Sequence, residues 1–308
     1  MKTGAILLLV LSAFIWPRAL AAQTTIDLYT PARGPGSEQW TFQRTTRARG
    51  NETSIYNVRD PRIEVHLPDP AFANGTAVII LPGGGLRVLG RGKDTQDLIE
   101  LLLARGIAAI HLEYRTLQVA PETLDLPSPA STAPPAGQLP APSFPKLEIV
   151  KANANPAKGN TALDEVLRLA IEDAQQALRL VRSRAAEWRI DPRRIGMLGT
   201  SAGGGVAIGA LLADDPAARP DFLVSIYGPS LQDVDVRPDA PPLFIATEAD
   251  HGPVTDGLLA LFELWNEARR PAELHVYSVP TFATPVSLWG HRLLDWMEEQ
   301  ELVPRPSE

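Results

Sequence analysis

The sequence contains no cysteine among its 308 residues. Disulfide bonds, thiolate catalysis and zinc sites built on cysteine are therefore excluded, and the core alone must stabilise the fold. Positive charge is also scarce, with 29 Lys and Arg against 36 Asp and Glu, a net charge of −7 and no basic run. An acidic chain of this kind binds nucleic acid and anionic membranes poorly, so we expect neither as a partner.

The chain also lacks an apolar run long enough to span a bilayer. The apolar stretch of residues 5–16 is too short to cross about 30 Å of hydrocarbon, and Pro17 and Arg18 close it. Lys2 precedes the stretch and the tripeptide "ALA" ends it at Ala21, which is the layout of a secretory signal peptide. We therefore predict a signal peptide over residues 1–21, rather than a retained anchor, and a secreted or periplasmic protein. Its removal changes the net charge from −7 to −9, because Lys2 and Arg18 leave with it.

Short apolar runs alternate with helix-period stretches along the rest of the chain. The predicted strands are 77–81, 107–114, 195–199, 222–228, 243–247 and 274–279. The predicted helices are 94–105, 161–185, 202–213, 255–269 and 288–301, and Thr161 with Asp164 is the predicted start of the second. This order indicates an α/β fold with a mainly parallel sheet and helices on both faces. Weaker strand signals at 25–29 and 62–67 predict antiparallel strands at one edge of the sheet.

One segment interrupts this alternation. Residues 121–145 contain eight prolines and few large apolar side chains, a composition that forms no packed core. A linker between two domains is one interpretation. Because the alternation continues in step on both sides, we favour a long loop over the carboxyl edge of the sheet, within a single domain of residues 22–308.

Residues 199–203, Gly-Thr-Ser-Ala-Gly, follow a predicted strand and precede a predicted helix. This is the G-x-S-x-G elbow of serine hydrolases in its expected context. Gly199 and Gly203 leave room for the tight turn, and Ser201 stands at a helix N-terminus that favours developing negative charge. The alternative is a phosphate-binding turn, but G-x-x-x-x-G-K-[ST] is absent. We predict that Ser201 is a nucleophile.

A second glycine-rich turn follows the strand 77–81. Its three consecutive glycines are Gly83, Gly84 and Gly85. Backbone N–H groups in such a turn can stabilise the oxyanion of a tetrahedral intermediate. We predict an oxyanion hole made by Ala202 with Gly84 or Gly85. The alternative is a flexible strand-end turn, for which one glycine would suffice.

Four stretches together resemble a known family: 77–86, 105–115, 172–204 and 241–254, the last followed by 271–278. The chain is similar to α/β-hydrolases of the secreted acetylxylan and feruloyl esterase type, close to the hormone-sensitive-lipase-like carboxylesterases. The resemblance spans about residues 60–300. It implies the α/β-hydrolase fold and serine-ester chemistry, and it is much less specific for a substrate.

In this fold the catalytic acid follows the serine in the chain and the histidine comes last. Asp250, just past the strand 243–247, is the predicted acid, while Glu248 still lies at the exit of the strand. The resembled proteins usually carry two acids where this chain has Asp250-His251, so the register could shift by one.

The histidine is the difficult residue. The resembled proteins follow the strand at 273–277 with a Gly-His-Gly-Phe-type loop, whereas here residues 278–287 contain no histidine. His251 adjoins Asp250 too closely to be oriented by it easily. His275 is expected to lie inside its strand, with its imidazole packed against a helix as a core residue. We therefore predict that His291, early in the last helix, is the base. An exposed helix residue is the alternative for His291.

The predicted function is a secreted serine carboxylic-ester hydrolase that acts through an acyl-enzyme. By resemblance its substrate is a short acyl ester, such as acetyl groups on plant polysaccharide, and no metal or organic cofactor is implied. A serine peptidase is one alternative. A non-catalytic binding protein that keeps the fold and lacks the histidine is the other. The sequence does not indicate an oligomeric state.

Overall fold

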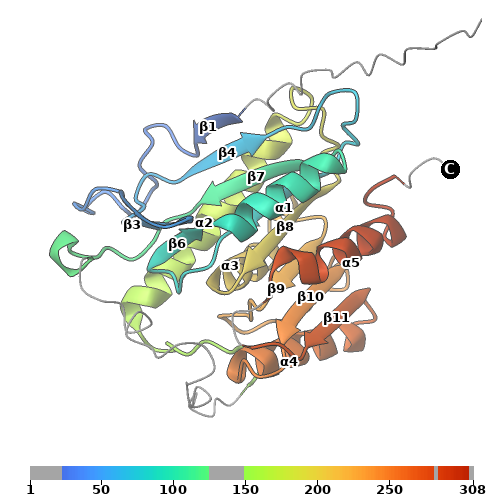
Figure 1. The fold of residues 1–308 in the computed structure, drawn as a ribbon. Helices are drawn as coiled ribbons and strands as arrows, with labels where there is room; N and C mark the ends of the chain where they lie inside the picture. Colours follow the sequence, from blue (N-terminus) through green and yellow to red (C-terminus); the bar gives the residue numbers. More distant parts are fainter. Residues whose placement is uncertain (1–22, 125–148, 281–283, 305–308) are drawn as a thin grey trace, which may run out of the picture.

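The computed structural model describes residues 23–124, 149–280 and 284–304. An eight-stranded sheet with the order β1-β4-β7-β5-β8-β9-β10-β11 forms its centre (Figure 1). The strands are β1 Gln23–Asp27, β4 Arg62–His66, β5 Ala77–Leu81, β7 Ala108–Glu113, β8 Ile195–Thr200, β9 Leu223–Ile226, β10 Leu243–Glu248 and β11 Ala272–Tyr277. From β7 to β11 neighbouring strands are parallel, and β1 and β4 add antiparallel pairs at one edge.

Helices cover both faces of this sheet. Helices α1 (Lys93–Ala104) and α5 (Val286–Glu299) pack on one face, and their apolar side chains join a core cluster with Val78, Ile80 and Phe244. Helices α2 (Thr161–Ser183), α3 (Ala202–Leu211) and α4 (Pro253–Glu267) pack on the other face with Ile79 and Ile245. Successive residues of one strand thus serve opposite cores, which explains why the central strands are apolar throughout.

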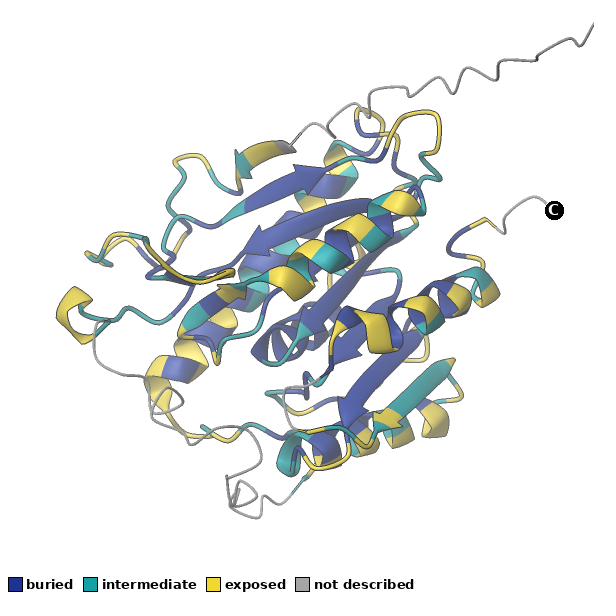
Figure 2. Ribbon diagram, in the orientation of Figure 1, coloured by how far each residue is buried: buried dark blue, intermediate teal, exposed yellow. Residues whose placement is uncertain are grey.

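Figure 2 shows that burial differs between the central and the outer strands of the sheet. Strands β5, β8, β9 and β10 are buried almost throughout, whereas β11 at one edge is half-buried and β1 at the other is mostly exposed. Because parallel strands all end at the same side, β5, β8, β9, β10 and β11 present their carboxyl ends along one edge, which we call the rim. The residues that follow these strands therefore meet at the rim.

The predicted α/β architecture is confirmed, with six strands and five helices at the predicted places. Helix α2 starts differently, because the side chain of Asn160, not Thr161, caps it by accepting a hydrogen bond from Leu163 N–H. A second, three-stranded sheet was not predicted: β2 (Thr45–Arg49), β3 (Glu52–Tyr56) and β6 (Val88–Arg91). The described residues also include the short 3₁₀ helices η1 (Pro121–Thr123) and η3 (Pro216–Ala218).

Two predictions lie outside the described residues. They are the signal peptide at 1–21 and the greater part of the Pro-rich loop, from residue 125 onward. The chain is described again from residue 149, where Asn153 forms a β-bridge with Ser230 just beyond β9. The segment after the Pro-rich loop therefore crosses the rim. Within the part of the chain that the structure describes, no helix combines the length and apolar character needed to cross a bilayer.

Candidate active site

Ser201 connects strand β8 to helix α3 in a strained conformation. Its φ of 50° and ψ of −127° lie outside the regions that a residue with a Cβ normally occupies. Two backbone hydrogen bonds hold it there: Ser201 N–H donates to Ile226 O at 3.1 Å, and Ser201 O accepts from Gly204 N–H at 2.9 Å. The strain points to function, because a sharp turn projects the side chain above the sheet at the start of a helix.

Glycines make this turn possible by close backbone contact. A Cβ on Gly199 would lie 2.3 Å from Gly203 O, and one on Gly203 would lie 2.2 Å from Leu81 O. At the next residue of α3, a Cβ on Gly204 would lie 2.6 Å from the Cα of Gly228. The serine is thus fixed by the backbones of strands β5, β8 and β9, as the spacing of the elbow predicts.

The glycine turn after β5 lies directly beside the serine. Gly83 N–H donates to Thr200 Oγ1 at 3.0 Å, and a Cβ on Gly83 would lie 2.9 Å from the Cβ of Ser201. Gly84 has a φ of 139°, and a Cβ there would lie 1.8 Å from Val88 O. Among the described residues, no acceptor receives the N–H groups of Gly84, Gly85 or Ala202. Donors for a ligand oxygen therefore flank Ser201.

Ser201 lies between two cavities that meet at Ser201 and Gly85. The rim cavity has a volume of about 410 Å³ and is lined by polar side chains that include Thr200, Thr284, Glu52 and Asp94, together with Tyr227 and Trp289. The side cavity has a volume of about 170 Å³ and is lined mainly by apolar residues of α2, α4 and the segments 154–157 and 229–231. The rim cavity falls within the size range of small-molecule sites.

The structure places the predicted acid and base away from these walls. Asp250 is exposed in the turn between β10 and α4, and His291 is exposed on α5. Neither belongs to the described residues that line the two cavities. Ser201, Gly84, Gly85 and Ala202 are therefore brought together at the cavities, and Asp250 and His291 do not line them.

A different acid–histidine pair lies close to the rim cavity. Glu248 is fully buried at the end of β10, and its Oε2 lies 2.8 Å from Nδ1 of His251, which is 4% exposed. The other carboxylate oxygen, Oε1, accepts a hydrogen bond from the hydroxyl of Thr284. Burial raises the pKa of Glu248, but the hydrogen bonds from His251 and Thr284 outweigh it and hold the pKa below its ordinary value. The carboxylate is therefore ionised and fixed in orientation at neutral pH.

Two side chains connect this pair to the rim cavity. Thr284, the partner of Glu248, lines the cavity, and so does Tyr227, whose ring centroid lies 6.2 Å from that of His251. Burial, followed by the charges of Asp94 and Glu248, raises the pKa of Tyr227 to about 12, so its phenol stays protonated. From the sequence, Glu248 and His251 were considered as acid and base, but Asp250 and His291 were preferred. The sequence does contain a sign of this pair: His251 follows Glu248 by three residues at the end of a strand, and Gly252 comes next.

The remaining histidines lie elsewhere. His275 is half-buried on β11, where its Nε2 lies 2.6 Å from Glu273 Oε1 and its ring packs beside Phe244. This matches its predicted place within the strand. His66 lies 2.7 Å from Glu64 at the edge of the sheet opposite the rim, and His111 is fully buried in β7. Among the described residues, no group of three or more His, Asp or Glu side chains is arranged to hold a metal ion.

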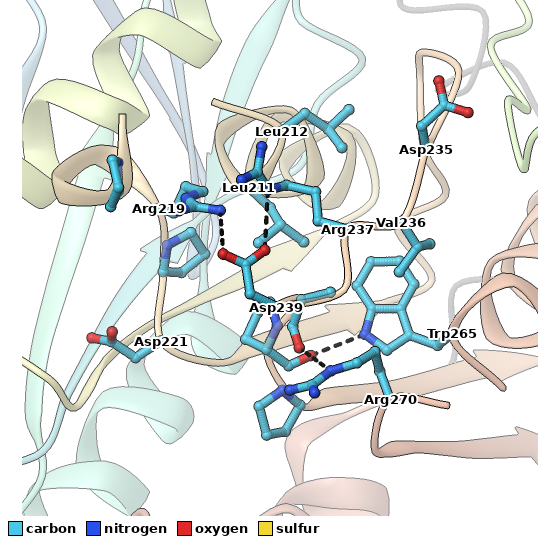
Figure 3. Close-up of a pocket in the computed structure, with 15 residues that line it drawn as sticks. Leu211, Leu212, Arg219, Asp221, Asp235, Val236, Arg237, Asp239, Trp265 and Arg270 are labelled. Atoms are coloured by element: carbon cyan, nitrogen blue, oxygen red, sulfur yellow. Dashed lines mark hydrogen bonds and ion pairs between the residues drawn. The ribbon is translucent and has the colours of Figure 1, made fainter. Parts of the chain in front are cut away.

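A third cavity, of about 350 Å³, lies at the amino ends of β9, β10 and β11, on the side of the sheet opposite the rim (Figure 3). We call it the opposite-edge cavity. Arg219 and Arg237 both bind Asp239, each at 3.1 Å. Trp265 Nε1 donates to Pro241 O at 2.9 Å, and Arg270 donates to Ala240 O at 2.6 Å. Figure 3 shows these interactions as dashed lines. The charged groups that they join are thus paired with one another or hydrogen-bonded to the backbone.

The comparisons with known proteins agree with the observed fold. Residues 161–288 match a family model described as alpha/beta hydrolase fold. No curated protein matches the chain by sequence. Solved structures do match it. The acetyl ester-xyloside bifunctional hydrolase of Caldicellulosiruptor lactoaceticus is 20% identical over 80% of this chain and 90% of that chain, with a TM-score of 0.53.

Two further structures match over their whole length. The carboxylesterase Cest-2923 of Lactobacillus plantarum is 13% identical over 86% of this chain and 100% of that chain, with a TM-score of 0.56. Thermogutta terrifontis esterase 2, phosphoramylated by tabun, is 16% identical over 90% of this chain and 100% of that chain, with a TM-score of 0.52. Together with the sheet order and the elbow, these matches show that the chain has the α/β-hydrolase fold.

Proposed function

We propose that the protein is a serine carboxylic-ester hydrolase that forms an acyl-enzyme on Ser201. The observation that carries the proposal is the strained elbow, which holds this serine between two cavities and beside N–H groups that have no acceptor within the described part of the chain. Acyl transfer needs these features together: a nucleophile above a helix N-terminus, donors for the oxyanion, and space for both sides of the ester.

In the proposed reaction, Ser201 Oγ attacks the ester carbonyl carbon and the carbonyl oxygen becomes an oxyanion. The N–H groups of Ala202 and of Gly84 and Gly85 would donate to that oxyanion, which fits their lack of other acceptors. The C–O bond to the alcohol then breaks, and the alcohol leaves with a proton from the base. Water attacks the acyl-serine in the second half of the reaction and releases the carboxylic acid.

The base can be assigned in two ways. The sequence assigns it to His291 with Asp250 as its acid. The structure supports His251 with Glu248, because a buried carboxylate already holds Nδ1 of this imidazole, the arrangement that orients a catalytic histidine. We favour His251, which lies behind the wall formed by Tyr227 and Thr284. In this assignment His251 would accept the proton of Ser201 Oγ and later donate it to the departing alcohol.

For the substrate we propose short acyl esters of a polar alcohol, with acetylated polysaccharide as the example, acted on outside the cytoplasm after removal of residues 1–21. Hydroxyl and carboxylate groups in the rim cavity are suitable acceptors and donors for a sugar. The similarity to an acetyl ester-xyloside hydrolase supports the same class. The apolar run before Ala21 supports export.

A second candidate is a non-catalytic binding protein. The exposed position of His291 and the absence of histidine from residues 278–287 favour it. In that case the cavities would bind a ligand and Ser201 would lack an activating base.

A fluorophosphonate probe separates these two functions. In an active serine hydrolase the serine oxygen displaces fluoride and bonds covalently to phosphorus, so we expect labelling of the wild type and none of Ser201→Ala. Ser183→Ala, at an exposed helix position, is the matched control and should label fully. Labelling should accompany hydrolysis of p-nitrophenyl acetate. A folded wild-type protein that takes no label and hydrolyses no ester would be the binding protein instead.

A further inference from the structure

Tyr227, the residue directly after strand β9, has a strained backbone. Its φ of 39° lies in the left-handed region, which a tyrosine rarely adopts. Its N–H donates to Ala246 O of β10 at 2.7 Å, and this bond helps to hold the conformation. Among the described residues that line the rim cavity, Ser201 and Tyr227 are the two that combine a side chain with a positive φ. Strain of this kind clusters at functional sites, where the surrounding structure maintains it.

Backbone contacts fix Tyr227 relative to Ser201. The residue before Tyr227 is Ile226, whose O accepts the N–H of Ser201 at 3.1 Å. The residue after it is Gly228, where a Cβ would lie 2.8 Å from Ser201 O and 2.8 Å from the Cα of Gly204. The residues on both sides of Tyr227 therefore contact the serine turn. The two strained residues keep a constant relative position in the rim cavity.

The hydroxyl of Tyr227 is available to a ligand. It has no hydrogen-bond partner among the described residues, and it is not one of the buried polar atoms without a partner, so it is open to the cavity that its side chain lines. Two other tyrosines differ in this respect. The hydroxyl of Tyr114 donates to Pro82 O at 2.6 Å, and that of Tyr29 donates to Asp173 at 3.0 Å. Those two hydroxyls stabilise the fold, whereas that of Tyr227 remains a free donor.

The position of Tyr227 indicates which ester oxygen this donor would meet. Tyr227 lies against His251, with ring centroids 6.2 Å apart, and it lines the wall of the rim cavity on that side. In acyl transfer the departing oxygen receives its proton from the base, so it must face the base. With His251 as the base, the departing oxygen faces the wall that contains Tyr227.

Resting on the proposed function with His251 as the base, we infer that Tyr227 is a further catalytic residue, whose hydroxyl donates a hydrogen bond to the ester oxygen that departs with the alcohol. When the C–O bond breaks, its electron pair stays on this oxygen. The Tyr227 hydroxyl stabilises the negative charge that develops there, and His251 supplies the proton. Tyr227 keeps its own proton throughout. Burial, followed by the charges of Asp94 and Glu248, raises the pKa of Tyr227 to about 12, which agrees with a donor rather than a base.

The test compares acetate esters whose departing oxygens differ in basicity. From p-nitrophenol to phenol to ethanol, the departing oxygen becomes more basic and needs more stabilisation. Loss of one preorganised donor costs about 10²- to 10³-fold, so Tyr227→Phe should lower kcat/KM for ethyl acetate by about 10²-fold. The loss should shrink to about tenfold for phenyl acetate and to less than about threefold for p-nitrophenyl acetate, because p-nitrophenolate departs with little help.

Tyr277→Phe is the matched control. It removes the same hydroxyl from a tyrosine at the end of β11 that is not among the described residues lining the two cavities, so kcat/KM should stay unchanged for all three esters. Urea unfolding and complete fluorophosphonate labelling show that Tyr227→Phe is folded and keeps Ser201 in place. Should this variant fail to fold, Tyr227→Asn replaces it, because asparagine tolerates a positive φ and its short side chain does not reach the same point. It should show the same graded loss.

Two results would overturn the inference. One is an equal loss of kcat/KM for all three esters, which is the mark of a structural role for Tyr227. The other is no loss for any of them. In both cases esterase activity that depends on Ser201 would remain, and the proposed function would stand. A wild type that hydrolyses no ester and takes no fluorophosphonate label would instead refute the proposed function itself.

Discussion

The rim cavity and the opposite-edge cavity are similar in size, at about 410 and 350 Å³, but differ in what their groups bind. In the opposite-edge cavity, Arg219 and Arg237 both form ion pairs with Asp239, so these contacts stabilise the fold. At the rim, Ser201 has a strained backbone, and backbone N–H groups beside it have no acceptor among the described residues. Unsatisfied polar groups, rather than cavity volume, therefore distinguish the candidate site from a cavity whose groups are already paired.

The largest effect should come from the serine itself. Ser201→Ala should lower kcat for p-nitrophenyl butanoate by about 10⁴-fold or more, because it removes the nucleophile while alanine can occupy the same backbone position. Asp239→Asn in the opposite-edge cavity should leave kcat unchanged. Steady-state hydrolysis measures both. A comparable loss in Asp239→Asn would mean that the two cavities do not differ as described.

The next effect concerns the base. His251→Ala should lower kcat by about 10²- to 10⁴-fold, and His291→Ala should have almost no effect because its side chain is exposed and lines neither cavity. The reverse result, a loss with His291→Ala alone, would support the assignment made from the sequence.

A smaller effect is expected from the glycines of the elbow. Gly203→Ala would place a Cβ 2.2 Å from Leu81 O, and overpacking of this kind costs about 1–3 kcal/mol. The variant should unfold at a lower denaturant concentration and lose activity, because relief of the contact moves Ser201. Gly90→Ala, where a Cβ would meet only Gly83 O at 3.8 Å, is the control and should unfold close to the wild type. Equal free energies of unfolding for the two variants would contradict the expectation that a Cβ at position 203 overpacks the turn.

The smallest effect concerns pH. Since the folded-state pKa of Glu248 lies below its ordinary value, its ionised form stabilises the fold at neutral pH, and this contribution is lost as the pH falls through the folded pKa. Urea unfolding of the wild type and Glu248→Gln should therefore differ most above about pH 5 and converge in stronger acid. Asp239→Asn, which removes an exposed ion pair, should show much less pH dependence. A constant difference between wild type and Glu248→Gln at all pH values would contradict the pKa assignment.

Much of the fold could be predicted because the central strands are apolar on both faces and the helices have one apolar face. The run at 77–81 and the amphipathic stretch from 161 match β5 and α2 closely. The three-stranded sheet could not be predicted in the same way. Strand β2 reads "TTRAR" and is largely exposed, so its side chains carry no pattern of burial, and only its pairing with β3 defines it.

The candidate site likewise has a part that the sequence predicts and a part that it does not. The elbow and the glycine turn were predictable because close backbone contact permits only glycine at several positions. The pair Glu248 and His251 was not, because it depends on how the chain turns after β10. The turn at residues 249–250 brings the imidazole back onto the carboxylate three residues earlier. A linear sequence shows the spacing of these residues but not the direction of the turn.

The contacts that position Ser201 have a consequence for how its specificity could change. The serine is held by backbone atoms of three strands, whereas the side cavity is walled by side chains from α2, α4 and two connecting segments. Substitutions at positions such as Ala157 or Leu231 can therefore reshape the space for a ligand without displacing the nucleophile. Under the proposed function, the side chains that would contact a substrate are therefore separate from the backbone that holds Ser201, and a library of variants confined to the side cavity should change substrate preference while the position of Ser201 stays constant.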